Sequence, residues 1–234
     1  MVEKGPSNQL LVTVIIATLN AENYLANALE SVFKQSFTEY EVLIVDGGSI
    51  DNTLSIAQSF PKTKILTQKG KGLFDAWNEG IKSASGNYIA FLDSDDYWEP
   101  NTLAMHMNSL IANPDLIGSV GHVNFFLESN ETPPAEFKLS LLNGSHLAYM
   151  PGCFVGKKNI VEMIGFFETK WQVASDILWF AKIKEMDEKI MTLDKVVLNK
   201  RVHNKNISYS AAKRDTYDKE LLELLHLKLK ERKT

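Results

Sequence analysis

Apolar residues in the first hundred positions form four short, nearly continuous runs, separated by stretches in which apolar residues recur every three or four positions. Short runs rich in Val and Ile are typical of strands buried on both faces, and the wider spacing is typical of amphipathic helices. Their regular alternation predicts right-handed βαβ units and a largely parallel sheet. The predicted strands are residues 12–18, 41–45, 64–67 and 88–92, and the predicted helices begin near residues 25, 53 and 73.

The second half of the chain has a less regular pattern. We expect an α/β fold made of a polar lead (1–9), a single domain (10–210) and an amphipathic C-terminal helix (211–234). Within the domain the pattern predicts helices at 101–113, 157–164 and 175–185, strands at 116–127 and 189–197, and a loop or insertion at 128–145.

Three carboxylates follow the fourth predicted strand directly: Asp93, Asp95 and Asp96. Like charges brought close together raise one another's pKa, and a bound divalent cation is the usual compensation. Carboxylate oxygens suit Mg²⁺ or Mn²⁺, and ligands of open α/β sheets bind at the carboxyl ends of strands. The alternative is that these residues only form a turn and cap a helix.

Composition narrows the classes of function. With 44% hydrophobic and 23% charged residues the chain is of ordinary globular type, and its net charge of −4 argues against a general nucleic-acid binder. Cys153 is the one cysteine, so an internal disulfide is impossible and a reducing compartment follows. The N-terminal residues lack the apolar core of a signal peptide. We expect a cytoplasmic protein, with the inner face of the cell membrane as the alternative location.

Five segments, in order, resemble the family 2 glycosyltransferases of the GT-A fold. The resemblance extends over roughly residues 10–205 and implies a Rossmann-like, mostly parallel sheet flanked by helices, with a small acceptor-side region and a terminal helix. It implies a nucleotide-sugar-binding half at 10–100 and an acceptor and catalytic-base half at 101–210. The five segments are residues 12–20, 28–37, 45–53, 72–81 and 91–96.

The resemblance implies a metal-dependent, inverting glycosyltransferase with Mn²⁺ or Mg²⁺ as cofactor. It assigns Asp95 to the metal, Asp93 to the ribose or the water molecules bound to the metal, and His203 to the metal or a phosphate oxygen. The residues themselves agree, because no G-x-G-x-x-G or P-loop follows the first strand and no arginine precedes residue 201. A metal is therefore the expected charge partner of a donor's pyrophosphate.

The resemblance also gives a set of candidate donor-binding residues. Asp46 would read the nucleobase, although Gly47 stands where the family often has a second acid. Several members have structural alternatives: Asp46 as a turn residue, Asn20 as a cap of the first helix, and Asp75 as an exposed first-turn residue favoured by the helix dipole. The full set is Thr18, Asn20, Asp46, Gly48, Asp75, Asn78, Asp93 and Arg201, the last as a bidentate phosphate partner.

Asp176 is the candidate catalytic base, in a segment that resembles the one supplying the family's base. A carboxylate that removes the proton of an acceptor hydroxyl typically accelerates attack about 10²–10⁴-fold. Apolar neighbours indicate a partly buried carboxylate of raised pKa. Ser175 departs from the family's acidic pair, and Asp176 as a helix cap is the alternative role.

The expected function is transfer of a sugar from a nucleoside-diphosphate donor, with UDP favoured, to a saccharide or lipid-linked saccharide in bacterial polysaccharide or lipopolysaccharide synthesis. A sugar nucleotidyltransferase is an alternative, but the Gly-rich loop that it needs is missing. A catalytically silent sugar-nucleotide-binding protein is another, since Gly47 and Ser175 replace expected acids.

An apolar stripe near the C-terminus predicts a helix that packs on the body of the protein or on a second copy of the chain. A membrane-surface helix that meets a lipid-linked acceptor is the alternative, although the acidic residues at 215–223 weaken it. The stripe consists of Tyr217, Leu221, Leu224, Leu225 and Leu229.

Overall fold

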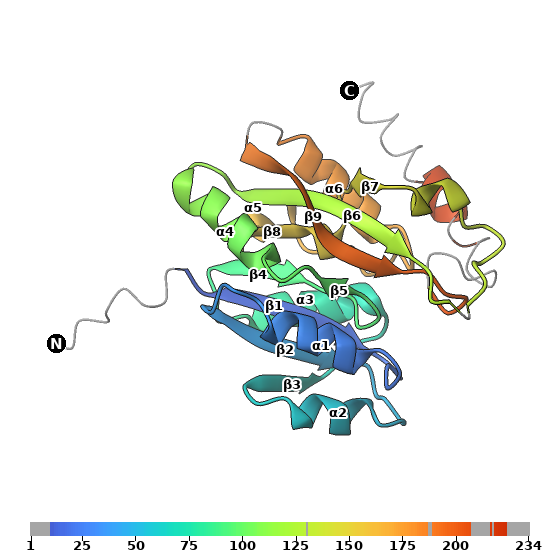
Figure 1. Cartoon of the computed structure of the whole chain (residues 1–234). Helices are drawn as coiled ribbons and strands as arrows, with labels where there is room; N and C mark the ends of the chain where they lie inside the picture. Colours follow the sequence, from blue (N-terminus) through green and yellow to red (C-terminus); the bar gives the residue numbers. More distant parts are fainter. Residues whose placement is uncertain (1–9, 130, 187–188, 207–215, 217, 224–234) are drawn as a thin grey trace.

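A computed structural model describes residues 10–129, 131–186, 189–206, 216 and 218–223, and within them nine strands form one sheet (Figure 1). The polar lead and most of the predicted C-terminal helix lie outside the described residues, as do four of the five stripe residues. Four parallel strands form the first half of the sheet in the order β3-β2-β1-β4. They are β1 (Val12–Thr18), β2 (Tyr40–Asp46), β3 (Thr63–Thr67) and β4 (Tyr88–Phe91).

The sheet continues from β4 through β8, β6, β9 and β5, and β7 pairs with the outer part of β6. Because β8 is antiparallel to both β4 and β6, and β9 is parallel to β6, the long strand β9 runs in the same direction as β4. These strands are β5 (Tyr97–Trp98), β6 (Gly118–Phe126), β7 (Ser145–Leu147), β8 (Phe154–Lys157) and β9 (Ile190–Arg201).

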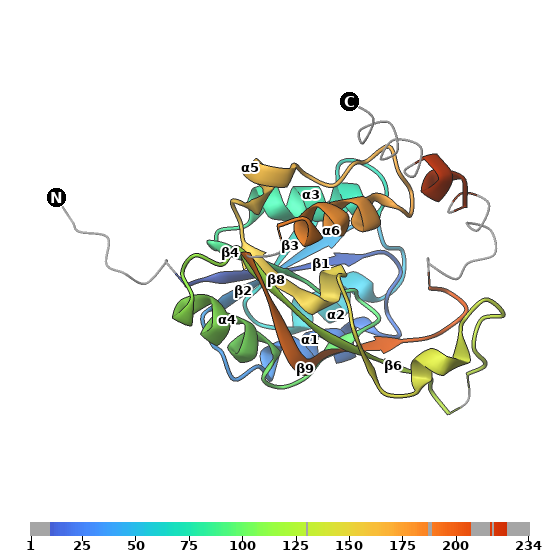
Figure 2. The same cartoon turned by 90° about the horizontal axis from the view of Figure 1, so that it is seen from above.

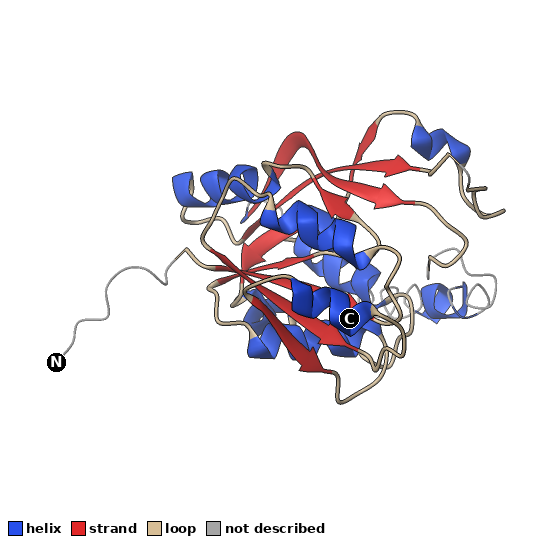
Figure 3. Ribbon diagram, turned by 60° about the horizontal axis from the view of Figure 1, so that its bottom comes forward, coloured by secondary structure: helices blue, strands red, loops and turns tan. Residues whose placement is uncertain are grey.

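Helices cover both faces of the sheet (Figures 2 and 3). One face carries α1 (Leu25–Phe33), α2 (Thr53–Ser59) and α4 (Thr102–Ala112). The other carries α3 (Leu73–Ser83), α5 (Ile160–Ile164) and α6 (Ser175–Lys184). Two 3₁₀ turns, Leu139–Leu142 and Pro151–Cys153, interrupt the connections of the second half.

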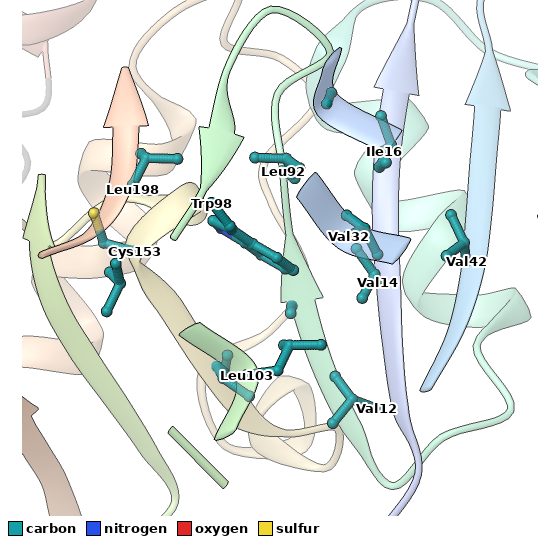
Figure 4. Packing of buried hydrophobic residues seen from close by; sticks show 14 of the residues in the cluster. Val12, Val14, Ile16, Val32, Val42, Leu92, Trp98, Leu103, Cys153 and Leu198 are labelled. Atoms are coloured by element: carbon teal, nitrogen blue, oxygen red, sulfur yellow. The ribbon is translucent and has the colours of Figure 1, made fainter. Parts of the chain in front are cut away.

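Alternate residues of the central strand β1 belong to two separate apolar clusters. Val12, Val14 and Ile16 belong to the cluster under α1, together with Trp98 (Figure 4), whereas Ile15 lies in the aromatic-rich cluster under α3 and α6. Every residue of β1 is buried, because successive side chains point to opposite faces and both faces are covered. This explains the near-continuous apolar run in the sequence.

The predicted fold class is confirmed: the architecture is α/β, and the four leading strands and three leading helices lie where the pattern predicted them. The prediction that Asn20 caps the first helix is wrong. Helix α1 begins after Tyr24 with no side-chain cap, and Asn20 instead accepts a hydrogen bond from the backbone N–H of Ile50 (3.0 Å). The short strands β5, β7 and β8 were not predicted, and β9 continues to Arg201, beyond the predicted end at residue 197.

Candidate active site

The carboxyl ends of β1, β2, β4 and β9 meet at one edge of the sheet, because these four strands run in the same direction. The loop after β4 is held beside the end of β9 by β5, whose Tyr97 pairs with Asn199 in antiparallel register. This pairing brings the acidic residues 93–96 next to residues 200–206. The two segments form the centre of the candidate site.

Lys200 lies among the three carboxylates that the sequence places after β4. Ligand oxygens of Asp93, Asp95 and Asp96 lie within 4.8 Å of one another. The ammonium of Lys200 is 3.1 Å from Asp93 and 2.8 Å from Asp96. Although burial alone lowers the pKa of Lys200, the neighbouring carboxylates, Asp96 first, raise it well above the ordinary value. A fixed cation therefore already offsets part of the acidic charge.

Both carboxylate oxygens of Asp96 already accept a hydrogen bond from the protein. Its side chain is 1% exposed, one oxygen accepts from Lys200, and the other accepts the backbone N–H of Arg201 at 2.8 Å. Its role is to join the β4 loop to the end of β9. The interpretation of Asp96 as a turn residue rather than a ligand fits this geometry.

Asp95 faces His203 and Asn206. Its Oδ2 is 3.0 Å from Nε2 of His203 and accepts from the Asn206 amide at 3.2 Å. Burial by itself raises the pKa of Asp95, but the hydrogen bond from His203 and the charge of Lys200 outweigh it and the pKa is lowered. The imidazole of His203 is 4% exposed and stacks on Tyr24, with ring centroids 4.9 Å apart. Asp95 is thus held as a carboxylate against an oriented imidazole.

These residues fit a divalent cation. Two neighbouring ligands of an octahedral ion with bonds of about 2.1 Å are separated by about 3 Å, and the carboxylate of Asp95 and Nε2 of His203 have this separation. The backbone N–H of Lys205 points to Nδ1 of His203 at 3.1 Å, so Nε2 carries the proton that Asp95 accepts. For Nε2 to bind a cation, the ring proton would have to move to Nδ1, at the cost of the hydrogen bond from Lys205. Asp93 is a further carboxylate of the same cluster, and it is shared with Lys200.

Side chains of the protein itself already surround the Arg201 guanidinium. It is 7% exposed and pairs with Glu128, donates to Asn27 at 3.1 Å, and lies between the rings of Tyr24 and Phe126 at 5.1 and 4.7 Å. It lines a polar cavity of about 660 Å³ beside His203. Its predicted role as a phosphate partner stays a prediction, and its observed role is to brace the end of β9.

The loop after β2 is organised around the buried Asp46 carboxylate. Asp46 is 3% exposed and accepts from the hydroxyls of Thr18 (3.2 Å) and Ser49 (2.5 Å) and from the backbone N–H groups of Gly48 (2.9 Å) and Ser49 (3.0 Å). Gly48 has φ 94°, a conformation that favours glycine. Asp51 accepts the backbone N–H of Thr53 at 3.0 Å, at the start of α2. The structure therefore assembles the predicted nucleobase loop, and nucleobase binding by Asp46 stays a prediction.

The two candidates on α3 have different surroundings. Asn78 is buried and exchanges two hydrogen bonds with the backbone of Phe167, at 2.8 and 3.0 Å, which ties α3 to the segment before α6. Asp75 lies in the first turn of α3 and lines a smaller cavity of about 310 Å³. Donor contacts by both residues stay predictions.

Asp176 lies in the first turn of α6 and is not the helix cap, which is Ala174. Its carboxylate accepts the backbone N–H of Ile177 at 2.8 Å. Burial, together with the negative charge of Asp93, raises the pKa of Asp176 from 3.8 to about 6. The carboxylates of Asp176 and Asp93 therefore lie close enough for their charges to interact. The hydroxyl of Ser175 is buried with no hydrogen-bond partner among the described residues.

Sequence reasoning missed Lys200. The available signal was the Lys-Arg pair just after the last predicted strand. The chain also clusters acidic residues just after its fourth predicted strand, and basic residues are their natural partners. The resemblance gives Arg201 of that pair a role and gives Lys200 none.

The glycosyl transferase family 2 model matches residues 13–167 of the 234-residue chain. The chain belongs to glycosyltransferase family 2. A similar relative is the Escherichia coli UDP-Glc:alpha-D-GlcNAc-diphosphoundecaprenol beta-1,3-glucosyltransferase WfgD, 40% identical over 106 residues that make up 44% of this chain and 42% of WfgD.

Two solved structures share the fold. Staphylococcus aureus TarS (residues 1–349) in complex with UDP-GlcNAc matches 86% of this chain and 61% of TarS, at 25% identity and a TM-score of 0.67. The mannosyltransferase PcManGT of Pyrobaculum calidifontis, in complex with GDP-Man and Mn²⁺, matches 86% of this chain and 59% of its own, at 23% identity and a TM-score of 0.61. This chain thus spans about half the length of these relatives. Its described residues contain no helix with the length and apolarity needed to cross a bilayer.

Proposed function

We propose that this chain is a metal-dependent, inverting glycosyltransferase that uses a nucleoside-diphosphate sugar. The observation that carries the proposal is that Asp176, a partly buried carboxylate of raised pKa, interacts electrostatically with Asp93 at the end of β4, where Asp95 and His203 offer a cation site. Membership in glycosyltransferase family 2 supports this function over sugar nucleotidyl transfer.

In the proposed reaction, Asp176 accepts the proton of an acceptor hydroxyl while that oxygen attacks the anomeric carbon of the donor. A base of raised pKa holds the proton more firmly than an ordinary aspartate does, and it is still ionised at pH 7. Attack from the face opposite the leaving group inverts the anomeric centre. The bond to the nucleoside diphosphate breaks as the new glycosidic bond forms.

Asp95 and His203, with Asp93, would hold Mn²⁺ or Mg²⁺. When bound, this ion stabilises the negative charge of the departing diphosphate. Lys200 keeps the β4 loop in place by pairing with Asp93 and Asp96, so that Asp95 remains directed at His203. Asp46, Gly48, Thr18 and the α3 residues form the neighbouring nucleotide part of the site.

UDP is the proposed nucleotide, since TarS binds UDP-GlcNAc and WfgD is named for UDP-Glc. The GDP-Man complex of PcManGT makes GDP the main competitor. By the same comparison we propose a saccharide or lipid-linked saccharide acceptor and a role in bacterial polysaccharide synthesis, by a cytoplasmic protein that meets its lipid-linked acceptor at the inner face of the membrane.

A panel of UDP- and GDP-sugars, incubated with the full chain and Mn²⁺ and read by nucleotide release, tests the proposal. Donors of one nucleotide class are expected to release their nucleoside diphosphate as the sugar is transferred or hydrolysed, and EDTA is expected to abolish this release. Asp176→Asn should release nucleotide at a background rate. Release that persists undiminished in EDTA, or no release from any donor in the presence of an acceptor extract, would contradict the proposal.

A further inference from the structure

The segment that leads into α6 presents three successive backbone N–H groups to one carboxylate. Gln172, Val173 and Ala174 donate to Glu220 at 2.6, 3.0 and 3.0 Å. Successive N–H groups of this kind form a concave nest that binds anions. The anion here is supplied by the chain itself, from 46 to 48 positions further along.

Among the described residues, no nearer side chain performs this task. The residue that caps α6 is Ala174, which has no polar side chain, and no side-chain cap bond is formed. The Asp176 carboxylate accepts from the backbone N–H of Ile177, and the Ser175 hydroxyl has no partner among the described residues. Without Glu220, the N–H groups of the incoming segment would lose their acceptor in a partly buried place, which is costly.

The Glu220 side chain is buried at this contact. It is 8% exposed, whereas Asp218, Lys219 and Glu223 on the same helical segment face solvent. The nest adjoins a small apolar cluster of Trp171 and Ala174 with Leu178 against it. Helical residues 218–223 are thereby attached by charge-assisted hydrogen bonds to the start of the helix that carries the proposed base.

We propose that Glu220 is a positioning residue for Asp176: it fixes the start of α6 and so makes the C-terminal segment part of the working active site. Asp176 lies two residues after Ala174, so a shift of the nest moves its carboxylate relative to Asp93 and the acceptor. A misplacement of about 1 Å can cost about 10²-fold in rate. This inference rests on the proposed function, because it takes Asp176 as the base.

The test compares Glu220→Ala and Glu220→Gln with Glu223→Ala, an exposed glutamate on the same segment, in the full chain. Turnover, Mn²⁺–UDP affinity and hydrogen exchange of residues 172–177 are measured for each. Glu220→Ala should lower kcat by about 10-fold to 10²-fold with UDP affinity unchanged and faster exchange at 172–177. Glu220→Gln, which keeps one acceptor oxygen, should retain more of the turnover, and Glu223→Ala should resemble the wild type.

Wild-type kcat in Glu220→Ala, or unchanged exchange at residues 172–177, would overturn the proposal. A parallel loss of kcat and of UDP-binding stoichiometry would also overturn it, since that pattern indicates general unfolding. If Glu220→Ala does not fold, the same measurements on Glu220→Gln decide the proposal. If the wild type transfers no sugar, the proposed function fails, and the exchange measurement alone still decides whether Glu220 holds the start of α6.

Discussion

Asp176 has the properties of a base because of where its carboxylate lies. Burial and the charge of Asp93 oppose its ionisation, and one hydrogen bond from the backbone of Ile177 favours it. The first two effects prevail and the pKa is raised from 3.8 to about 6. A carboxylate in this condition is both ionised at neutral pH and basic enough to accept a proton in the transition state.

Replacing Asp176 by Asn should lower kcat by about 10²–10⁴-fold, because the amide cannot accept the acceptor's proton. Donor affinity should change little, since the proposed metal and nucleotide contacts come from other residues. Steady-state kinetics and calorimetric titration with Mn²⁺–UDP measure the two quantities separately. Unchanged turnover in Asp176→Asn would remove this residue as the base.

The pH dependence of kcat follows from the raised pKa. The ionised carboxylate is the active form, so kcat should be level above pH 7 and should fall about tenfold per pH unit below about pH 6. An aspartate with the ordinary value of 3.8 would keep full activity down to about pH 5. The residual activity of Asp176→Asn should lack this fall, and a fall of equal size in that variant would assign it to another group.

Lys200 is expected to matter for stability. Lys200→Met leaves Asp93 and Asp96 without their cation, and removal of one member of a buried ion pair typically costs about 3–5 kcal/mol. Urea unfolding should show this loss, and Asp96→Asn in the same chain should recover part of it. Lys195→Met, an exposed position on the same strand, is the control and should change the free energy of unfolding by about 0.5 kcal/mol or less. Equal effects at both lysines would contradict this role.

The candidate residues that could be predicted are those with a local pattern around them. Asp95 follows an apolar strand within a D-x-D, and Asp176 stands in an apolar segment that resembles a family motif. Lys200 and Glu220 have no such pattern, because their partners lie 104 to 107 and 46 to 48 positions away and meet them only through tertiary pairing. Asn20 has the local pattern of a cap, but the φ of 50° that it adopts directs it to the β2 loop instead.

At the scale of elements, the site depends on how closely α3 packs on β1. A Cβ added at Gly80 of α3 would overlap the Cγ2 methyl of Ile15, which is fully buried in the central strand. The glycine therefore sets the distance between the helix and the sheet. Asp75 and Asn78 lie on the same helix, so this distance also places two of the candidate donor contacts.

Gly80→Ala should destabilise the protein by about 1–3 kcal/mol, because the strand cannot move without disturbing both clusters. In an exposed helix the same change would stabilise by about 1 kcal/mol, so the sign of the effect is informative. Ser83→Ala, at the exposed end of α3, is the control and should have an effect within about 0.5 kcal/mol. A stabilising Gly80→Ala would show that α3 lies further from β1.

Elements of the first half could be predicted because each strand has its own apolar run and each helix has its own repeat of apolar residues every three or four positions. The strands β5, β7 and β8 could not, since they have two, three and four residues and owe their conformation to the strands beside them. One of them, β5, holds the β4 loop against β9. The least predictable element is therefore the one that assembles the proposed metal-binding part of the site.

At the scale of the whole molecule, the site forms where the parallel half of the sheet meets the mixed half. The β2 and β4 loops come from the first half, His203 follows β9, and Asp176 comes from α6 on the opposite face to α1 (Figure 2). A donor bound at this edge would contact both halves. The central claim is that its diphosphate is held there through a divalent cation at Asp95 and His203.

Calorimetric titration of the full chain with UDP, in Mn²⁺ and in EDTA, tests that claim most directly. The wild type should bind UDP at least about tenfold more tightly in Mn²⁺, a difference of about 1.4 kcal/mol. Asp95→Asn should lose this gain, whereas Asp194→Asn, at a fully exposed aspartate on β9, should keep it. Equal affinity in Mn²⁺ and EDTA, or a metal-dependent gain that survives in Asp95→Asn, would contradict the account.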